Sequence, residues 1–105
     1  MQLAQEVYKI TSKFPEEEKF GLISQMRRSA VSIISNIAEG AGRNTDKSFS
    51  NFLAMSLGSQ FELESQLLLS TNMNFDTREV ADNVLEELTE LQKMTRALGW
   101  KLSNV

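Results

Sequence analysis

The sequence predicts an all-α protein: a single antiparallel four-helix bundle with up-down-up-down topology and a short first helix. Apolar residues recur every three or four positions in four segments, which is the pattern of amphipathic helices. No segment alternates apolar and polar residues as a half-buried strand does. Short connections between the segments favour antiparallel neighbours. A chain of 105 residues fits one domain, which we place over residues 1–105.

The first helix is predicted over residues 2–13. Leu3, Val7, Ile10 and Phe14 recur at helical spacing, and Pro15 ends the helix because the residue before a proline avoids the helical conformation. This helix has only about three turns, roughly half the length of the others. We therefore expect its start to be missing or frayed, which leaves part of the bundle core uncovered.

The second helix is predicted from residues 16–19 to Glu39, with Gly40 and Gly42 ending it in the left-handed conformation that glycine accepts. It carries two parallel apolar strips. The first strip comprises Ile23, Met26, Ala30, Ile33 and Ile37, and the second comprises Val31, Ile34 and Ala38. An apolar face of this width fits either a helix at the centre of its own bundle or a contact between subunits.

The third helix is predicted from a cap at Thr45 or Asp46 to about Thr71. Its expected core residues are Phe49, Phe52, Leu53, Leu57, Phe61, Leu63, Leu67 and Leu68. Gly58 lies inside this helix, where a glycine costs about 1 kcal/mol relative to alanine. We expect another helix to approach closely at this position, so that a leucine here would overpack the core.

The fourth helix has the clearest start signal. Asp76 and Glu79 have the spacing of a capping box, and Phe75 and Val80 have that of a hydrophobic staple. The expected buried positions are Ala81, Val84, Leu88, Leu91, Thr95, Leu98 and Leu102. Trp100 falls outside this set. Two roles fit its ring equally well: contact with another chain, or packing against the end of the first helix.

The composition argues against an enzyme, a metal site and a cofactor. The chain has no cysteine and no histidine, so thiolate zinc sites, Glu-x-x-His metal sites and the usual nucleophile–base pairs are excluded. No glycine-rich phosphate loop is present. No stretch has the roughly 20 apolar residues of a membrane span. The polar start does not resemble a secretory signal, and we expect a cytoplasmic protein.

Four basic residues, Arg27, Arg28, Arg43 and Lys47, are the candidates for contacts with nucleic-acid phosphates. The two adjacent arginines also suit pairing with carboxylates of the third helix, and the other two bases suit a solvated loop. The net charge is −3, with +1 on residues 1–43 and −4 on residues 44–105. This balance argues mildly against a dedicated nucleic-acid binder but leaves room for a local basic strip.

Two further sets of residues are expected to have structural roles. The first set should lie between the second and third helices, where it satisfies arginines or backbone groups: Asn36, Glu39, Glu62 and Glu64. The second set should contribute to a contact between copies of the chain: Val31, Ile34, Ala38 and Trp100.

The stretch from Pro15 to Leu67 resembles the 23S rRNA-intervening-sequence family, also called S23. The motifs that carry the resemblance are Lys13-Phe14-Pro15, Asn36-Ile37-Ala38-Glu39-Gly40 and Glu62-Leu63-Glu64-Ser65-Gln66-Leu67. The resemblance implies a bacterial four-helix bundle that forms a ring-shaped homo-oligomer, a pentamer. A relative is an accessory protein of diversity-generating retroelements that binds nucleic acid and a reverse transcriptase. The family's usual opening of the first helix is absent here, and this chain lacks that relative's basic charge.

These observations favour a non-enzymatic, homo-oligomeric accessory or scaffold protein that contacts structured RNA or DNA through its basic strip. The alternative is a protein-protein interaction module with no nucleic-acid role, which would use Trp100 and the second apolar strip of the second helix.

Overall fold

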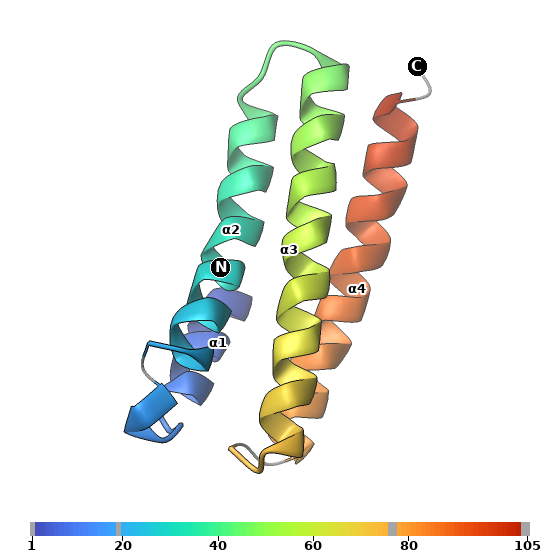
Figure 1. Cartoon of the computed structure of the whole chain (residues 1–105). Helices are drawn as coiled ribbons and strands as arrows, with labels where there is room; N and C mark the ends of the chain where they lie inside the picture. The colour runs from blue at the N-terminus through green and yellow to red at the C-terminus, as the bar shows by residue number, and fades with distance from the viewer. Residues whose placement is uncertain (1, 19, 76–77, 104–105) are drawn as a thin grey trace.

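The computed structural model describes residues 2–18, 20–75 and 78–103, and this part of the chain consists of helices without a strand (Figure 1). The elements are α1 (Gln2–Thr11), a 3-10 turn η1 (Glu16–Glu18), α2 (Leu22–Ala41), α3 (Asp46–Asn72) and α4 (Arg78–Ser103). The predicted all-α class with a short first helix is confirmed. No helix in the described ranges is both long and apolar enough to cross a membrane.

Three long helices run side by side along the molecule, whose extents are 46 × 23 × 18 Å, with α3 between α2 and α4 (Figure 1). The short α1 contacts α2 and α4 but covers only one half of the bundle. We call this half the lower half, and we call the opposite end, where α2 connects to α3, the upper end. Ten residues of helix span about 15 Å, so α1 cannot reach the upper end.

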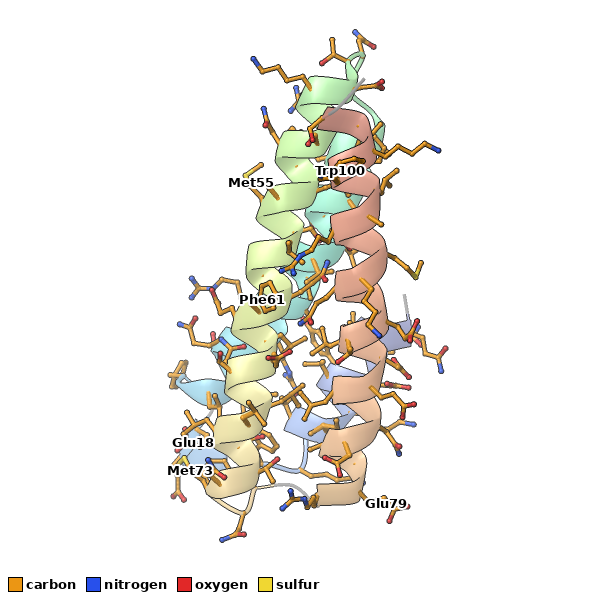
Figure 2. All side chains as sticks on the ribbon, turned by 90° about the vertical axis from the view of Figure 1, so that its right-hand side faces the viewer. Glu18, Met55, Phe61, Met73, Glu79 and Trp100 are labelled. Atoms are coloured by element: carbon orange, nitrogen blue, oxygen red, sulfur yellow. The ribbon has the colours of Figure 1, made fainter. Side chains whose placement is uncertain are left out.

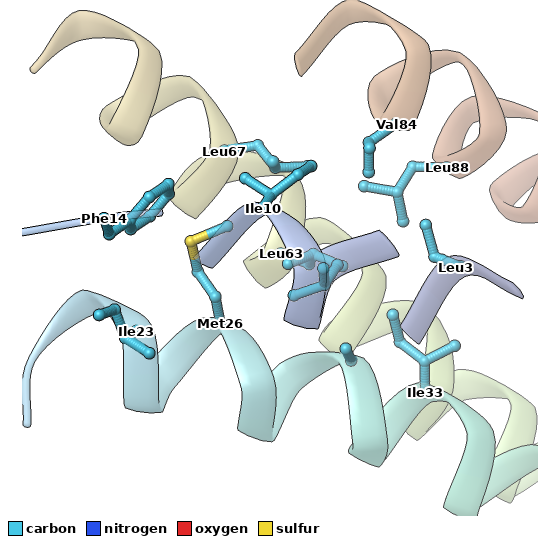
Figure 3. Packing of buried hydrophobic residues seen from close by; sticks show 12 residues of the cluster. Leu3, Ile10, Phe14, Ile23, Met26, Ile33, Leu63, Leu67, Val84 and Leu88 are labelled. Atoms are coloured by element: carbon cyan, nitrogen blue, oxygen red, sulfur yellow. The ribbon is translucent and has the colours of Figure 1, made fainter. Parts of the chain in front are cut away.

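The apolar core lies in the lower half, where all four helices meet (Figure 3). Val7, Met26, Ile33, Leu63 and Leu88 are completely buried there. Burying such side chains stabilises the fold by roughly 1.5–3 kcal/mol each, before the cost in conformational entropy. The helical spacing of these residues in the sequence places them on the inner faces, as predicted.

The core becomes polar at mid-height, above the start of α1. The Nε2 atom of Gln60 donates hydrogen bonds to Ser56 Oγ at 3.2 Å and to Thr95 Oγ1 at 3.0 Å. The Ser56 hydroxyl in turn donates to the backbone oxygen of Ile33 at 3.0 Å. All three polar side chains are buried, so hydrogen bonds replace apolar packing where only α2, α3 and α4 meet.

Both ends of α2 differ from the prediction. Glu16–Glu18 form a separate 3-10 turn, and α2 begins only at Leu22. Gly40 lies inside the helix rather than ending it, and Gly42 caps the helix with a φ of −85°, which is not left-handed. The backbone amide of Gly42 donates to the carbonyl groups of Ala38 and Glu39, so the last turn closes without a positive φ.

The glycine at a close helix contact is Gly40, not Gly58. A Cβ atom added to Gly40 would lie 2.7 Å from Phe52 Cβ and 2.9 Å from Phe49 Cδ1. A Cβ atom added to Gly58 would meet nothing within 4 Å, and this residue is exposed. The predicted close approach at Gly58 is therefore wrong, because this residue lies on the outer face of α3.

The predicted start of α3 is confirmed, since Thr45 Oγ1 accepts a hydrogen bond from the backbone amide of Ser48 at 3.1 Å. Two predicted core residues of this helix are wrong: Phe61 is 40% exposed and Leu68 is 49% exposed. The expected set spreads around too much of the helix for all members to face inward. Leu98 on α4 is also exposed, because α1 does not extend to its level.

The start of α4 is only partly described. Asp76, the predicted cap, lies outside the described residues, so the capping box stays a prediction. Phe75 packs against Phe14 at the lower end, with the two ring centroids 5.5 Å apart. This contact joins the loop before α4 to the loop after α1.

Candidate interaction surfaces

A shallow hollow of about 610 Å³ lies on the outer face of α1 and α2 in the lower half. Its lining residues are Tyr8, Phe20, Ile23, Ser24, Arg27, Arg28, Val31 and Ser32. Phe20 is 89% exposed and Val31 is 45% exposed, which is unusual for large apolar side chains on one small surface. The hollow therefore combines apolar surface with two arginines.

The two arginines of this hollow have different roles. Arg27 Nε donates to Thr11 Oγ1 at 2.9 Å, and its guanidinium carbon lies 4.6 Å from the centroid of the Tyr8 ring. Arg27 thus fastens α1 to α2, and the expected pairing with a carboxylate of α3 does not occur. Arg28 is exposed and makes no hydrogen bond or ion pair with any residue that the structure describes. Arg28 is therefore the arginine available to a ligand.

The other two predicted basic residues lie far from this hollow. Arg43 Nη2 forms an ion pair with Glu39 Oε1 at 2.8 Å, and its guanidinium carbon lies 4.8 Å from the Phe52 ring centroid. Lys47 is exposed at the start of α3. The rise of an α-helix separates Arg28 from Arg43 by about 20 Å along α2. The structure thus places the four bases in two separate groups and not in one strip.

A third basic group, which was not predicted from the sequence, lies on the outer face of α3 and α4 toward the upper end. The guanidinium carbon of Arg96 lies 5.6 Å from the centroid of the Phe61 ring. Trp100, one turn further along α4, is 70% exposed (Figure 2). No acidic residue occurs in residues 47–61 or 91–103, which contain Lys47, Lys93, Arg96 and Lys101. That run of bases without acids is the signal that could have located this surface.

The four polar residues expected to be structural all have partners, but they do not form one group. Asn36 Nδ2 donates to the backbone oxygen of Ser32 at 2.9 Å, within α2. Glu62 accepts from Ser29 Oγ at 2.8 Å, which joins α3 to α2. Glu64 accepts from Gln92 Nε2 at 2.9 Å, which joins α3 to α4. Glu39 forms an ion pair with Arg43, which lies one turn further along the chain.

The four residues expected at an oligomer contact lie on two different sides of the bundle. Val31 and Ala38 are exposed and Ile34 is half-buried, and all three continue the face of α2 that carries Arg27. That face adjoins α1. Trp100 lies on α4 one turn from Arg96, which contacts α3, so its surface adjoins α3.

Acidic side chains meet where α1 packs on α4. Burial raises the pKa of the Glu87 carboxyl, and the charge of Glu6 together with a hydrogen bond to Glu6 raises this pKa further. Glu86 and Glu90 line the same shallow depression. Across the described ranges, no group of three or more acidic residues has an arrangement that could hold a metal ion.

Residues 1–97 match the family model described as 23S rRNA-intervening sequence protein. The chain belongs to this family. Among solved structures, it is similar to a protein of unknown function from the S23 ribosomal protein family of Bacteroides thetaiotaomicron. The identity is 27%, the TM-score is 0.82, and the alignment covers 92% of this chain and 91% of the other. No curated protein matches the chain.

Proposed function

We propose that this protein is a cytoplasmic, non-enzymatic accessory or scaffold protein that works as a homo-oligomer. The observation that carries the proposal is the exposure of large apolar side chains on two separate sides of a small bundle. Phe20 and Val31 lie on the side of α1 and α2, and Trp100 lies on the side of α3 and α4. Soluble monomers rarely leave such surfaces in water.

Two different surfaces are what a head-to-tail assembly requires, because each copy must offer one surface to each neighbour. Covering such apolar surface returns roughly 25 cal/mol per Å² before the costs of association. A closed ring of the pentameric kind that the family resemblance implies would bury both surfaces of every copy.

Light scattering at micromolar concentration tests the assembly. We expect a mass several times that of the 11.9 kDa chain, and substitution of Val31→Glu or Trp100→Ala should lower it. Met55→Glu is the matched control, because Met55 is similarly exposed, at 49%, but is not among the proposed contact residues. A mass near 11.9 kDa for the unaltered protein would contradict the proposal.

Contact with structured RNA or DNA is a second candidate function, favoured by the exposed guanidinium of Arg28 and by the bases Arg43 and Lys47. An oligomer would repeat these cations around its axis and raise the local positive charge. Binding to structured RNA should weaken steeply as salt rises, because phosphate contacts release counterions. Affinity that does not depend on salt would favour the alternative, a module that binds only proteins.

A further inference from the structure

We propose that the outer face of α3 and α4 near the upper end binds unpaired nucleotides, which stack on Trp100 and Phe61 while Arg96 and Lys93 hold the phosphates. This inference rests on the proposed contact with nucleic acid and adds its site and its ligand class. The site requires an accessible Trp100, so nucleotides and a neighbouring copy of the chain compete for this face, and the experiment below separates the two.

The two aromatic residues lie on the same side of the α3–α4 pair, and helix geometry tilts their side chains toward each other. Arg96 contacts the Phe61 ring, and Trp100 follows Arg96 by one turn on α4. Figure 2 labels Phe61 on α3 and, nearer the upper end, Trp100 on α4. Side chains on a helix lean toward its N-terminus. Because α3 and α4 are antiparallel, Phe61 leans toward the upper end and Trp100 leans toward the lower end. Their exposed ring faces therefore border the same stretch of surface.

Gly58 keeps this stretch open. It lies one turn before Phe61, on the side toward which that ring leans, and a Cβ atom there would meet nothing within 4 Å. A glycine inside a helix lowers its stability relative to alanine, and no close helix contact explains it here. Ala54 precedes Gly58 by one turn and is also small and exposed. Two small residues beside two exposed rings leave room for a flat aromatic group.

The positive charge of this surface of α3 and α4 favours an anionic partner. Lys93 lies one turn before Arg96 on the same face, and neither residues 47–61 nor residues 91–103 contain an acidic residue. Lysine is depleted at protein-protein interfaces but is a common phosphate contact. Exposed aromatic rings combined with such cations are the recurring arrangement that binds single strands. A base inside a duplex has both faces covered, so only an unpaired base fits these rings.

Trp100 is the single tryptophan of the chain, so its fluorescence reports directly on this surface. The experiment titrates the full chain with a 20-nucleotide oligothymidylate, a 20-base-pair DNA duplex and heparin, at low and moderate salt. We expect the oligothymidylate to quench the fluorescence in a saturable manner, and the duplex and heparin to quench it much less. Binding of labelled oligothymidylate should weaken at least roughly fivefold in Trp100→Leu, and Trp100→Phe should restore most of it.

Gly58→Leu supplies a second test that leaves both rings in place. The leucine would occupy the open surface beside Phe61, and binding should weaken as strongly as in Trp100→Leu. The matched control is Ser65→Leu. Ser65 is exposed one turn beyond Phe61, and the Phe61 ring leans away from it. Circular dichroism at the same protein concentration checks that each variant is folded.

Three results would overturn the inference. If the oligothymidylate binds without changing the fluorescence and Gly58→Leu binds normally, nucleic acid is contacted elsewhere, and the proposed function stands without this site. If dilution of the free protein changes the fluorescence and oligothymidylate does not, a second copy occupies this face. If no nucleic acid binds at low salt, both this site and the nucleic-acid role fail.

Discussion

Alanine at Gly40 and alanine at Gly58 should have opposite effects on stability. At Gly40 the added Cβ atom would lie 2.7 Å from Phe52 Cβ, an atom fixed to the backbone of α3, so the two helices must move apart. Overpacking of this kind costs about 1–3 kcal/mol. At Gly58 the added atom meets nothing within 4 Å, and the better helix propensity of alanine should stabilise α3 by about 0.5–1 kcal/mol.

The pair of variants separates packing from propensity, because both replace a helical glycine with alanine. We expect their free energies of unfolding to differ by about 2 kcal/mol, which corresponds to a difference in Tm of roughly 8–16 °C for a chain of this size. Thermal and urea unfolding followed by circular dichroism at one fixed protein concentration would measure it. Equal shifts for both variants would refute the reasoning, because they would mean that α2 and α3 do not meet closely at Gly40.

The remaining predictions concern α1 and its neighbours. Arg27→Ala should destabilise the docking of α1 by about 1–3 kcal/mol, because the hydrogen bond to Thr11 and the contact with Tyr8 are lost. Arg28→Ala should change the stability by less than about 0.5 kcal/mol. Faster hydrogen exchange in α1 for the first variant alone would be the expected observation. The pKa of Glu87 is raised in the folded state, so its contribution favours folding at low pH and is lost as pH rises from the ordinary value of 4.5 through the raised value. Glu87→Gln should therefore flatten the pH dependence of stability in that range and stabilise the protein at pH 7. A pH dependence identical to that of the unaltered protein would contradict the coupling between Glu6 and Glu87.

The lower half of the fold could be predicted from the sequence because its periodicity and its environment agree. Val7, Met26 and Leu88 each belong to an apolar set with helical spacing, and all three are buried in the one cluster to which all four helices contribute. The upper end could not be predicted in the same way. Phe61 and Leu98 have the same apolar character as the core residues, but no fourth helix covers them at their level. Periodicity identifies a face of a helix, but it does not say how far a neighbouring helix extends.

The partners of polar side chains were harder to predict from the sequence. A carboxylate was the expected partner of Arg27, but the tertiary arrangement supplies a threonine hydroxyl and a tyrosine ring. Gly40 and Gly58 look alike in the sequence, because the distance to a facing helix depends on packing between elements far apart in the chain. The surface formed by Phe61, Arg96 and Trp100 combines residues from two helices, so only the absence of acidic residues marks it in the sequence.

The change from an apolar to a polar core along the bundle has a consequence for local opening. Hydrogen bonds among Ser56, Gln60 and Thr95 can be exchanged for hydrogen bonds to water, whereas the apolar packing of Leu63 with Leu88 cannot be replaced in that way. Separation of the helices at the upper end should therefore cost less free energy than global unfolding. We expect the protection of backbone amides against hydrogen exchange to fall from the lower half toward the connection between α2 and α3. The two halves would then behave as two partly independent cooperative units. The aromatic and basic residues near the upper end would then sit on the part of the molecule that adjusts most readily to a partner.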